Sequence, residues 1–129
     1  MEGQERNVYR GFRDLKVCQL SHKLTLQVFE AAKIFPKEEK YSLVDQIKSS
    51  SRSVCSNLAE ASRKGKHKAV FANKVTDAMQ EASETQNRLE FAGARKYISQ
   101  ELFEGPDDEY EDLIAMLNSM ERNVDKFCF

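Results

Sequence analysis

Hydrophobic residues recur every three or four positions in four successive stretches of this chain. Such spacing places the apolar side chains on one face of an α-helix and the polar side chains on the other. The pattern therefore predicts four amphipathic helices, at about 14–35, 41–64, 68–99 and 108–127. No stretch shows the alternation of apolar and polar residues that is typical of a β-strand.

Local signals define the ends of the first two predicted helices. Asp14 is a candidate N-cap of the first helix, because a short carboxylate side chain accepts hydrogen bonds from the free backbone N–H groups there, or else a first-turn acid that suits the helix dipole. Pro36 ends this helix, since the residue before a proline avoids the helical conformation. The short link 36–40 then makes the second helix run antiparallel to the first. Gly65 is the expected C-cap of the second helix.

A turn is predicted between the third and fourth helices. Residues 100–107 contain the adjacent pair Gly105 and Pro106, and such pairs mark turns. Asp107 and Asp108 follow this pair and are candidate N-caps of the fourth helix.

Four helices with short connections predict an all-α fold, an antiparallel up-down-up-down four-helix bundle. Residues 1–11 are charged without periodicity and are expected to form a flexible N-terminal arm, so the single bundle domain spans 12–129. The second helix is rich in serine and alanine, and we interpret it as the central packing helix. Apolar residues off the main spacing indicate an oligomer interface or a thicker core; they are Leu26, Phe29, Ile114 and Met116.

The composition narrows the class of protein. The 129 residues are 40% hydrophobic and 32% charged, which suits one compact domain with a highly charged surface. We find neither a signal peptide nor a membrane-spanning apolar run, and we expect a cytoplasmic protein without membrane contact. The three cysteines lie far apart and are expected to be reduced, and the two histidines lack ligand partners. We therefore expect no metal and no other cofactor.

Charge is distributed unevenly along the chain. Residues 1–75 contain 15 basic and 8 acidic residues, whereas residues 76–129 contain 5 and 13. One interpretation is a basic surface that contacts nucleic-acid phosphates. The other is that oppositely charged helices of one bundle face each other, with the basic cluster at 63–68 serving as a solvated helix end. The candidate nucleic-acid-binding residues are Arg10, Arg13, Lys16, Lys48, Arg52, Arg63, Lys64, Lys66 and Lys68.

The second helix also carries polar residues beside its apolar stripe. Asn57 and Glu60 are three positions apart and share a helix face. Because buried polar groups need hydrogen-bond partners, we expect a structural network that fixes helix register or a contact between subunits. Its candidate members are Ser53, Ser56, Asn57, Glu60 and Glu81.

A catalytic role is not expected for these residues. His22 and His67 lack the Glu-x-x-His spacing of a di-iron bundle. The chain also lacks a Gly-rich phosphate loop, and two histidines give no argument for a Ser-His-Asp set. We therefore predict that the protein is not an enzyme.

The string S-V-C-S-N-L-A-E-A at 53–61 resembles the signature of the 23S rRNA intervening-sequence proteins, also called the four helix bundle protein family. Cys18 stands where this family usually has tryptophan, and Cys55 where proline is common. Further likenesses cover roughly 9–127 and include Phe12, Asp14, Leu15, Val17, Pro36, Glu39, Tyr41, Leu43, Gln46, Ile47, Lys48, Phe71, Ala78 and Glu81.

This resemblance implies an antiparallel four-helix bundle that often assembles as a ring-like homopentamer. It also implies bacterial genes inside 23S rRNA intervening sequences, and kinship with accessory proteins of diversity-generating retroelements, which bind nucleic acid and a reverse transcriptase. Two hypotheses follow. The first is a non-catalytic, oligomeric protein associated with RNA or DNA through basic surface residues. The alternative is a structural or adaptor protein that mediates protein–protein interaction.

Overall fold

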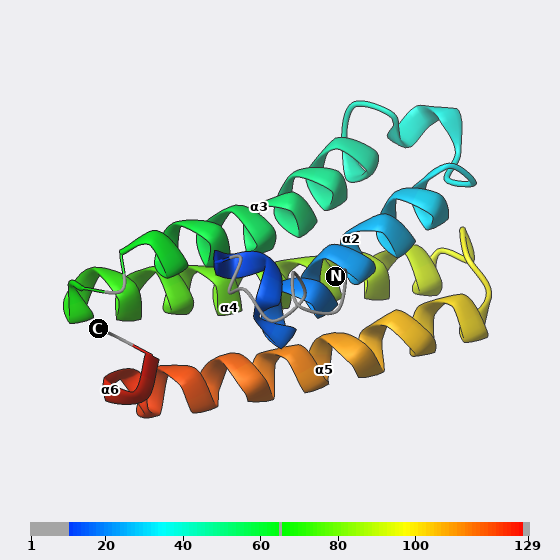
Figure 1. Ribbon diagram of the computed structural model, residues 1–129. Helices are drawn as coiled ribbons and strands as arrows, with labels where there is room; N and C mark the ends of the chain where they lie inside the picture. The colour runs from blue at the N-terminus through cyan, green and yellow to red at the C-terminus, as the bar shows by residue number, and fades with distance from the viewer. Residues whose placement is uncertain (1–10, 65, 128–129) are drawn as a thin grey trace, which may run out of the picture.

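The computed structural model describes residues 11–64 and 66–127, without the Phe127 side chain. Residues 1–10 of the arm expected at 1–11, with Arg10, lie outside the described residues, as do the expected C-cap Gly65 and Cys128. The last residue of that arm, Gly11, begins the first short helix of the structure. Within the described part of the chain all regular structure is helical (Figure 1). The elements are η1 (Gly11–Asp14), α2 (Lys16–Ala32), η2 (Lys37–Glu39), α3 (Leu43–Arg63), α4 (Lys68–Ala94), α5 (Gln100–Arg122) and α6 (Val124–Phe127).

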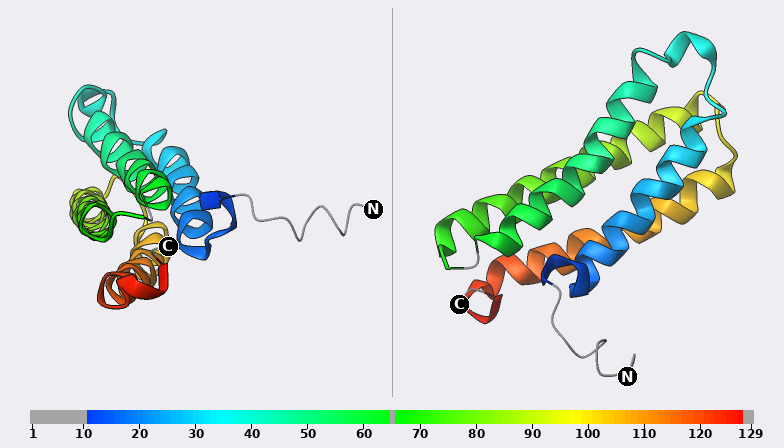
Figure 2. Two further views of the ribbon diagram at one scale, coloured as in Figure 1. Left: turned by 60° about the vertical axis from the view of Figure 1, so that its left-hand side comes forward. Right: turned by 45° about the horizontal axis from the view of Figure 1, so that its top comes forward.

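The four long helices form one bundle. Successive helices run in opposite directions (Figure 1), and the packed pairs are α2–α3, α3–α4, α4–α5 and α2–α5. The end-on view in Figure 2 shows α3 and α5 on opposite sides of the bundle. The predicted all-α fold with four packed helices is therefore confirmed.

The core consists of the predicted apolar stripes. Small side chains allow close contact on the faces that α3 and α4 bury, because Ser50, Ser51, Ala78 and Ala82 are all buried there. The largest fully buried side chains come from all four helices and include Leu24, Val28, Ile47, Val54, Leu58, Phe71, Val75, Leu89, Tyr110, Leu113 and Leu117.

The off-stripe apolar residues divide into two groups. Ile114 and Met116 on α5 are partly buried and pack against the core, so they thicken it. Leu26 on α2 is instead 53% exposed. Phe29, one helical turn further along α2, is half-buried at the surface beside α3.

The first helix is shorter than predicted. Asp14 belongs to η1 and is not the N-cap, which is Leu15 in an extended conformation. Leu15 packs against the core, and this contact separates the short turn η1 from α2. At the other end the helix stops at Ala32 instead of 35. Phe35 then packs on Tyr97 with a ring-centroid distance of 5.8 Å.

The turn predicted at 100–107 is wrong, because these residues lie inside α5. The helix starts at Gln100, since the side-chain oxygen of Ser99 accepts a hydrogen bond from the Leu102 backbone N–H at 3.1 Å. Pro106 sits within the helix, where it lacks one backbone donor, but its ring is buried. Asp107 and Asp108 are thus mid-helix residues.

The chain reverses direction between α4 and α5 at 95–99. Lys96 adopts a positive φ of 62°, which turns the backbone out of α4. The Tyr97 hydroxyl in this connection donates to Glu39 Oε2 at 2.8 Å, and Ser42 donates to Glu39 Oε1 at 2.6 Å. These two hydrogen bonds, from Ser42 and then Tyr97, lower the pKa of Glu39 and tie the two connections at this end of the bundle together.

Replacing the cap residue should weaken α5. Ser99→Ala should lower the free energy of unfolding by about 1 kcal/mol, because the Leu102 N–H loses its acceptor. Urea denaturation followed by circular dichroism measures this change. Ser83→Ala, at an exposed position within α4, is the matched control and should change the free energy by less than about 0.5 kcal/mol. Equal losses in the two variants would contradict the capping role.

Candidate nucleic-acid interface

The outer surface of α2 and α3 combines aromatic rings with cations. Lys48 Nζ and Arg52 Cζ on α3 lie 5.4 Å and 5.6 Å from the ring centroid of Phe29 on α2. Arg13 in η1 lies over the ring of its neighbour Phe12, with Cζ 4.7 Å from the centroid. Cations at these distances are attracted to the ring face. The three charged groups are therefore held at the surface while remaining accessible.

A pocket of about 370 Å³ lies beneath η1, which packs on both α2 and α3. The amide nitrogen of Gln19 donates to the Arg13 carbonyl oxygen at 3.0 Å and fastens η1 to α2. The residues lining the pocket are Phe12, Arg13, Cys18, Gln19, Ser21, His22 and Cys55.

The two thiols of this pocket differ in environment. Cys18 is buried, and this burial, with Cys55 nearby, raises its pKa to about 11. Cys55 is partly exposed, and its sulfur lies 3.5 Å from the Ser21 hydroxyl and 3.4 Å from the Thr25 hydroxyl. Both of these cysteines are free thiols.

A second basic region lies at the end of the bundle where α3 connects to α4. Arg63, Lys64, Lys66 and Lys68 are all exposed there. Lys68 forms an ion pair with Asp125 of α6. Lys16, at the start of α2, is also exposed.

Some of the described cations have an acidic partner on a neighbouring helix, and others form no ion pair. Lys23 pairs with Glu109 of α5 at 2.8 Å, and Lys74 pairs with Glu60 of α3 at 3.1 Å. Opposite charges thus face each other at these two helix contacts. Among the described residues, by contrast, several predicted cations form no ion pair; these are Arg13, Lys16, Lys48, Arg52, Arg63, Lys64 and Lys66.

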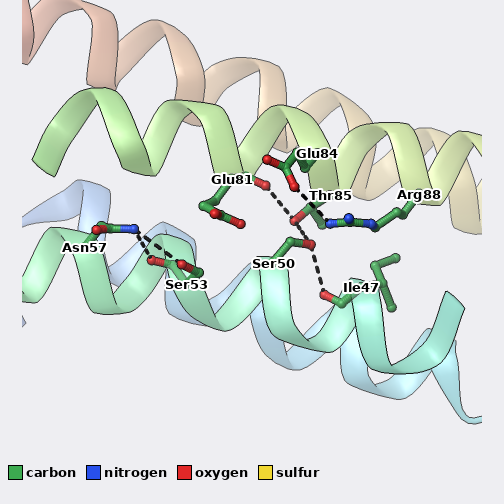
Figure 3. Close-up of polar contacts among 8 residues, drawn as sticks. All are labelled: Ile47, Ser50, Ser53, Asn57, Glu81, Glu84, Thr85 and Arg88. Carbon is green, nitrogen blue, oxygen red and sulfur yellow. Dashed lines mark hydrogen bonds and ion pairs between the residues drawn. The ribbon is translucent and has the colours of Figure 1, made fainter. Parts of the chain in front are cut away.

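The residues expected to form one polar network lie along the α3–α4 contact but bond separately. Asn57 donates to Ser53 O at 2.9 Å and to Ser53 Oγ at 3.3 Å (Figure 3). Ser56 donates to the Arg52 carbonyl oxygen, and Glu60 pairs with Lys74. Their contacts therefore remain within α3, except for the ion pair of Glu60.

Glu81 is the candidate from α4. It is partly buried beside α3 (Figure 3), and this burial, followed by the nearby Glu84, raises its pKa. Its backbone carbonyl accepts a hydrogen bond from the Thr85 hydroxyl at 2.9 Å. No hydrogen bond joins the Glu81 carboxylate to Ser53, Ser56 or Asn57 among the described residues.

A buried hydroxyl pair connects α3 to α4, and sequence reasoning missed it. The hydroxyls of Ser50 and Thr85 are 2.7 Å apart, and both residues are buried (Figure 3). The available signal was the position of the two residues within apolar stripes, three after Ile47 and four before Leu89. A similar contact joins α2 to α3, where the Thr25 hydroxyl donates to the Ser51 carbonyl oxygen at 3.0 Å.

Two further properties complete the site. Within 11–64 and 66–127, no three or more His, Cys, Asp or Glu side chains gather in a way that would hold a metal ion. No helix in the same part of the chain has the length and apolarity to cross a membrane.

Fold and surface together define a small four-helix bundle protein with a basic, partly aromatic surface. The model of the 23S rRNA-intervening sequence protein family matches residues 13–119. Because this match covers most of the chain, the protein belongs to that family, in agreement with the resemblance found in α3.

One solved structure is closely similar in fold. It is a protein of unknown function from the S23 ribosomal protein family of Bacteroides thetaiotaomicron, with a TM-score of 0.75 and 27% sequence identity. The alignment covers 83% of this chain and 99% of that one. A comparison with curated proteins found no match.

The buried hydroxyl pair should show energetic coupling. Ser50→Ala and Thr85→Val should each lower the free energy of unfolding by about 0.5–1.5 kcal/mol, because each removes the hydrogen bond between two buried hydroxyls while the remaining hydroxyl keeps a backbone carbonyl acceptor. In the double variant, the loss of unfolding free energy should be smaller than the sum of the two single losses by at least about 0.5 kcal/mol. A cycle of the exposed Ser49→Ala with Thr85→Val should be additive. Additivity in the Ser50–Thr85 cycle would refute the coupling.

The raised pKa of Cys18 should appear in its alkylation kinetics. In the folded protein, the rate of reaction with iodoacetamide should continue to rise with pH toward about 11, because only the thiolate reacts. In urea the alkylation rate of Cys18 should level off above a pH of about 8.5, which is the ordinary thiol pKa. Peptide mass spectrometry follows both reactions. Coinciding pH profiles for the folded and unfolded protein would contradict the prediction.

Proposed function

We propose that this protein is a non-catalytic, oligomeric scaffold that associates with nucleic acid through its basic surface. The observation that carries the proposal is the set of predicted cations without acidic partners on η1, α3 and the connection to α4. Lysine and arginine side chains that are not neutralised by the protein attract phosphates and release their counterions. Membership of a family named for the 23S rRNA intervening sequence supports RNA as the nucleic acid, of rRNA or retroelement type.

The acidic helix α5 favours one orientation of the ligand. It carries eight acidic residues against one arginine and lies across the bundle from α3 (Figure 2). Phosphates are therefore repelled from the α5 side and attracted to the α3 side. Assembly of several copies, such as the homopentamer implied by the sequence resemblance, would multiply a weak contact by avidity.

A second candidate function is that of an adaptor, which self-associates or binds another protein such as a reverse transcriptase. Exposed apolar side chains favour it, because such residues mark interaction surfaces when they cluster. Ile34 is 59% exposed and lines a groove of about 500 Å³ between α2 and α5, together with Leu102 and Pro106. Among the residues that the structure describes, the other large exposed apolar side chains are Leu26, Tyr41, Val70 and Phe91.

A filter-binding titration with structured RNA and single-stranded DNA tests the first candidate. The wild-type protein should bind, and the logarithm of its affinity should fall linearly with the logarithm of the salt concentration. The triple variant Arg63→Glu, Lys64→Glu and Lys66→Glu should bind more weakly, with a slope reduced by about 0.7–0.9 for each lost phosphate contact.

The matched control reverses three exposed lysines at the opposite end of the bundle, Lys37, Lys40 and Lys96, each to Glu. It changes the net charge equally and should retain most of the binding. Sedimentation velocity on all samples separates the two candidates. Loss of RNA binding with unchanged sedimentation supports the nucleic-acid role, whereas dissociation of an oligomer supports the adaptor. Absence of wild-type binding, or binding without salt dependence, would refute the first candidate.

A further inference from the structure

We infer that the pocket beneath η1 receives an unpaired nucleobase, so that the protein selects single-stranded over double-stranded nucleic acid. This inference rests on the proposed function and assigns a chemical class of ligand to one place on the basic surface.

The pocket has the composition of a base-binding site. At about 370 Å³ it is mostly apolar, with the Phe12 ring and the two thiols among its lining. Ligand pockets of this kind hold a planar group by apolar contact and orient it with a few polar groups. The Arg13 guanidinium covers one face of the Phe12 ring, so the ring adds apolar surface to the pocket and the guanidinium supplies a planar group on which a base can stack.

Two polar side chains at the pocket are available to the edge of a base. Gln19 uses its amide nitrogen to hold η1, but no described residue donates to its side-chain oxygen. His22 is exposed, and within the described chain its ring forms no hydrogen bond. Ser21 is already occupied, since its hydroxyl donates to the Cys18 carbonyl oxygen at 3.0 Å.

Several cations lie beside the pocket, where they can contact the phosphates of a nucleic-acid strand whose base is bound in it. Arg13 lines the pocket itself. On α3, Lys48 and Arg52 precede the lining residue Cys55 by seven and three positions, so all three lie on one helix face. Each step along this face is one helical turn of about 5.4 Å. A base in the pocket therefore places the adjoining phosphates beside Arg13 and the α3 cations.

A base of a duplex can enter this pocket only at an additional cost in free energy. Its bases are paired and stacked, and a base enters a protein pocket only after it leaves the stack. In single strands, loops and bulges the bases are already accessible to aromatic rings and guanidinium planes. The phosphate contacts alone do not distinguish the two forms, so the preference for single strands comes from the pocket.

Fluorescence anisotropy with three labelled probes tests the inference: a short poly(U) RNA, the corresponding DNA and a short RNA duplex. The full-length wild-type protein should bind the two single strands at least about tenfold more tightly than the duplex. Comparison of the RNA and DNA probes shows whether the 2′-hydroxyl contributes.

Two variants connect the preference to the pocket. Cys55→Leu fills it and should weaken single-strand binding roughly tenfold while leaving duplex binding unchanged. The variant His22→Ala alters an exposed position and leaves the Gln19 hydrogen bond to η1 intact, so it removes one polar edge contact without releasing the pocket wall. Circular dichroism confirms that each variant is folded.

The outcomes separate this inference from the proposed function. Equal wild-type affinity for single strands and duplex, or unchanged single-strand binding in both pocket variants, overturns the pocket assignment while the basic surface remains. Failure of the wild-type protein to bind any probe at any salt concentration overturns both. Protection of Cys55 from alkylation by the single-stranded probes, without protection by the duplex, supports the pocket directly.

Discussion

The burial of one apolar stripe on α3 is the constraint from which the rest of the surface follows. Ile47, Val54 and Leu58 are at most 1% exposed, and α3 packs against both α2 and α4. Truncating such a side chain typically costs about 2–5 kcal/mol, which is a large share of the stability of a small domain. The rotation of α3 about its axis is therefore fixed, and Arg52 must lie on its outer side.

Hydroxyl contacts add specificity to this apolar seam. An apolar stripe alone tolerates sliding of one helix along another, whereas a buried hydroxyl must meet its partner or lose a hydrogen bond. Ser50 with Thr85 and Thr25 with the Ser51 carbonyl provide such contacts on both sides of α3. The predicted polar residues nearer the surface, such as Asn57, bond within their own helix instead. Register is thus specified in the core and not at the rim.

The sequence predicts what depends on local order and misses what depends on distant partners. The four helices follow from periodicity, which every segment carries within itself. Gly105 and Pro106 looked like a turn because local preference disfavours helix there, but the Ser99 cap and burial of the proline ring outweigh that preference. The Ser50–Thr85 contact joins residues 35 positions apart, and no local pattern specifies such a pairing. Likewise, the sequence identifies the basic residues, but whether each has an acidic partner depends on how the helices pack.

Acidic and basic residues lie on different sides of the bundle, so the nearly neutral protein has faces of different electrostatic potential. With a formal net charge of −1, the whole molecule has little electrostatic preference for phosphate. The acidic residues are concentrated on α5, however, and α3 lies on the other side (Figure 2). Because exposed charges are screened beyond about 8–10 Å at physiological salt, a strand beside α3 senses mainly the nearby cations. Net charge alone therefore does not fix the electrostatic preference of one face of the bundle, which depends on how the charges are distributed among the helices.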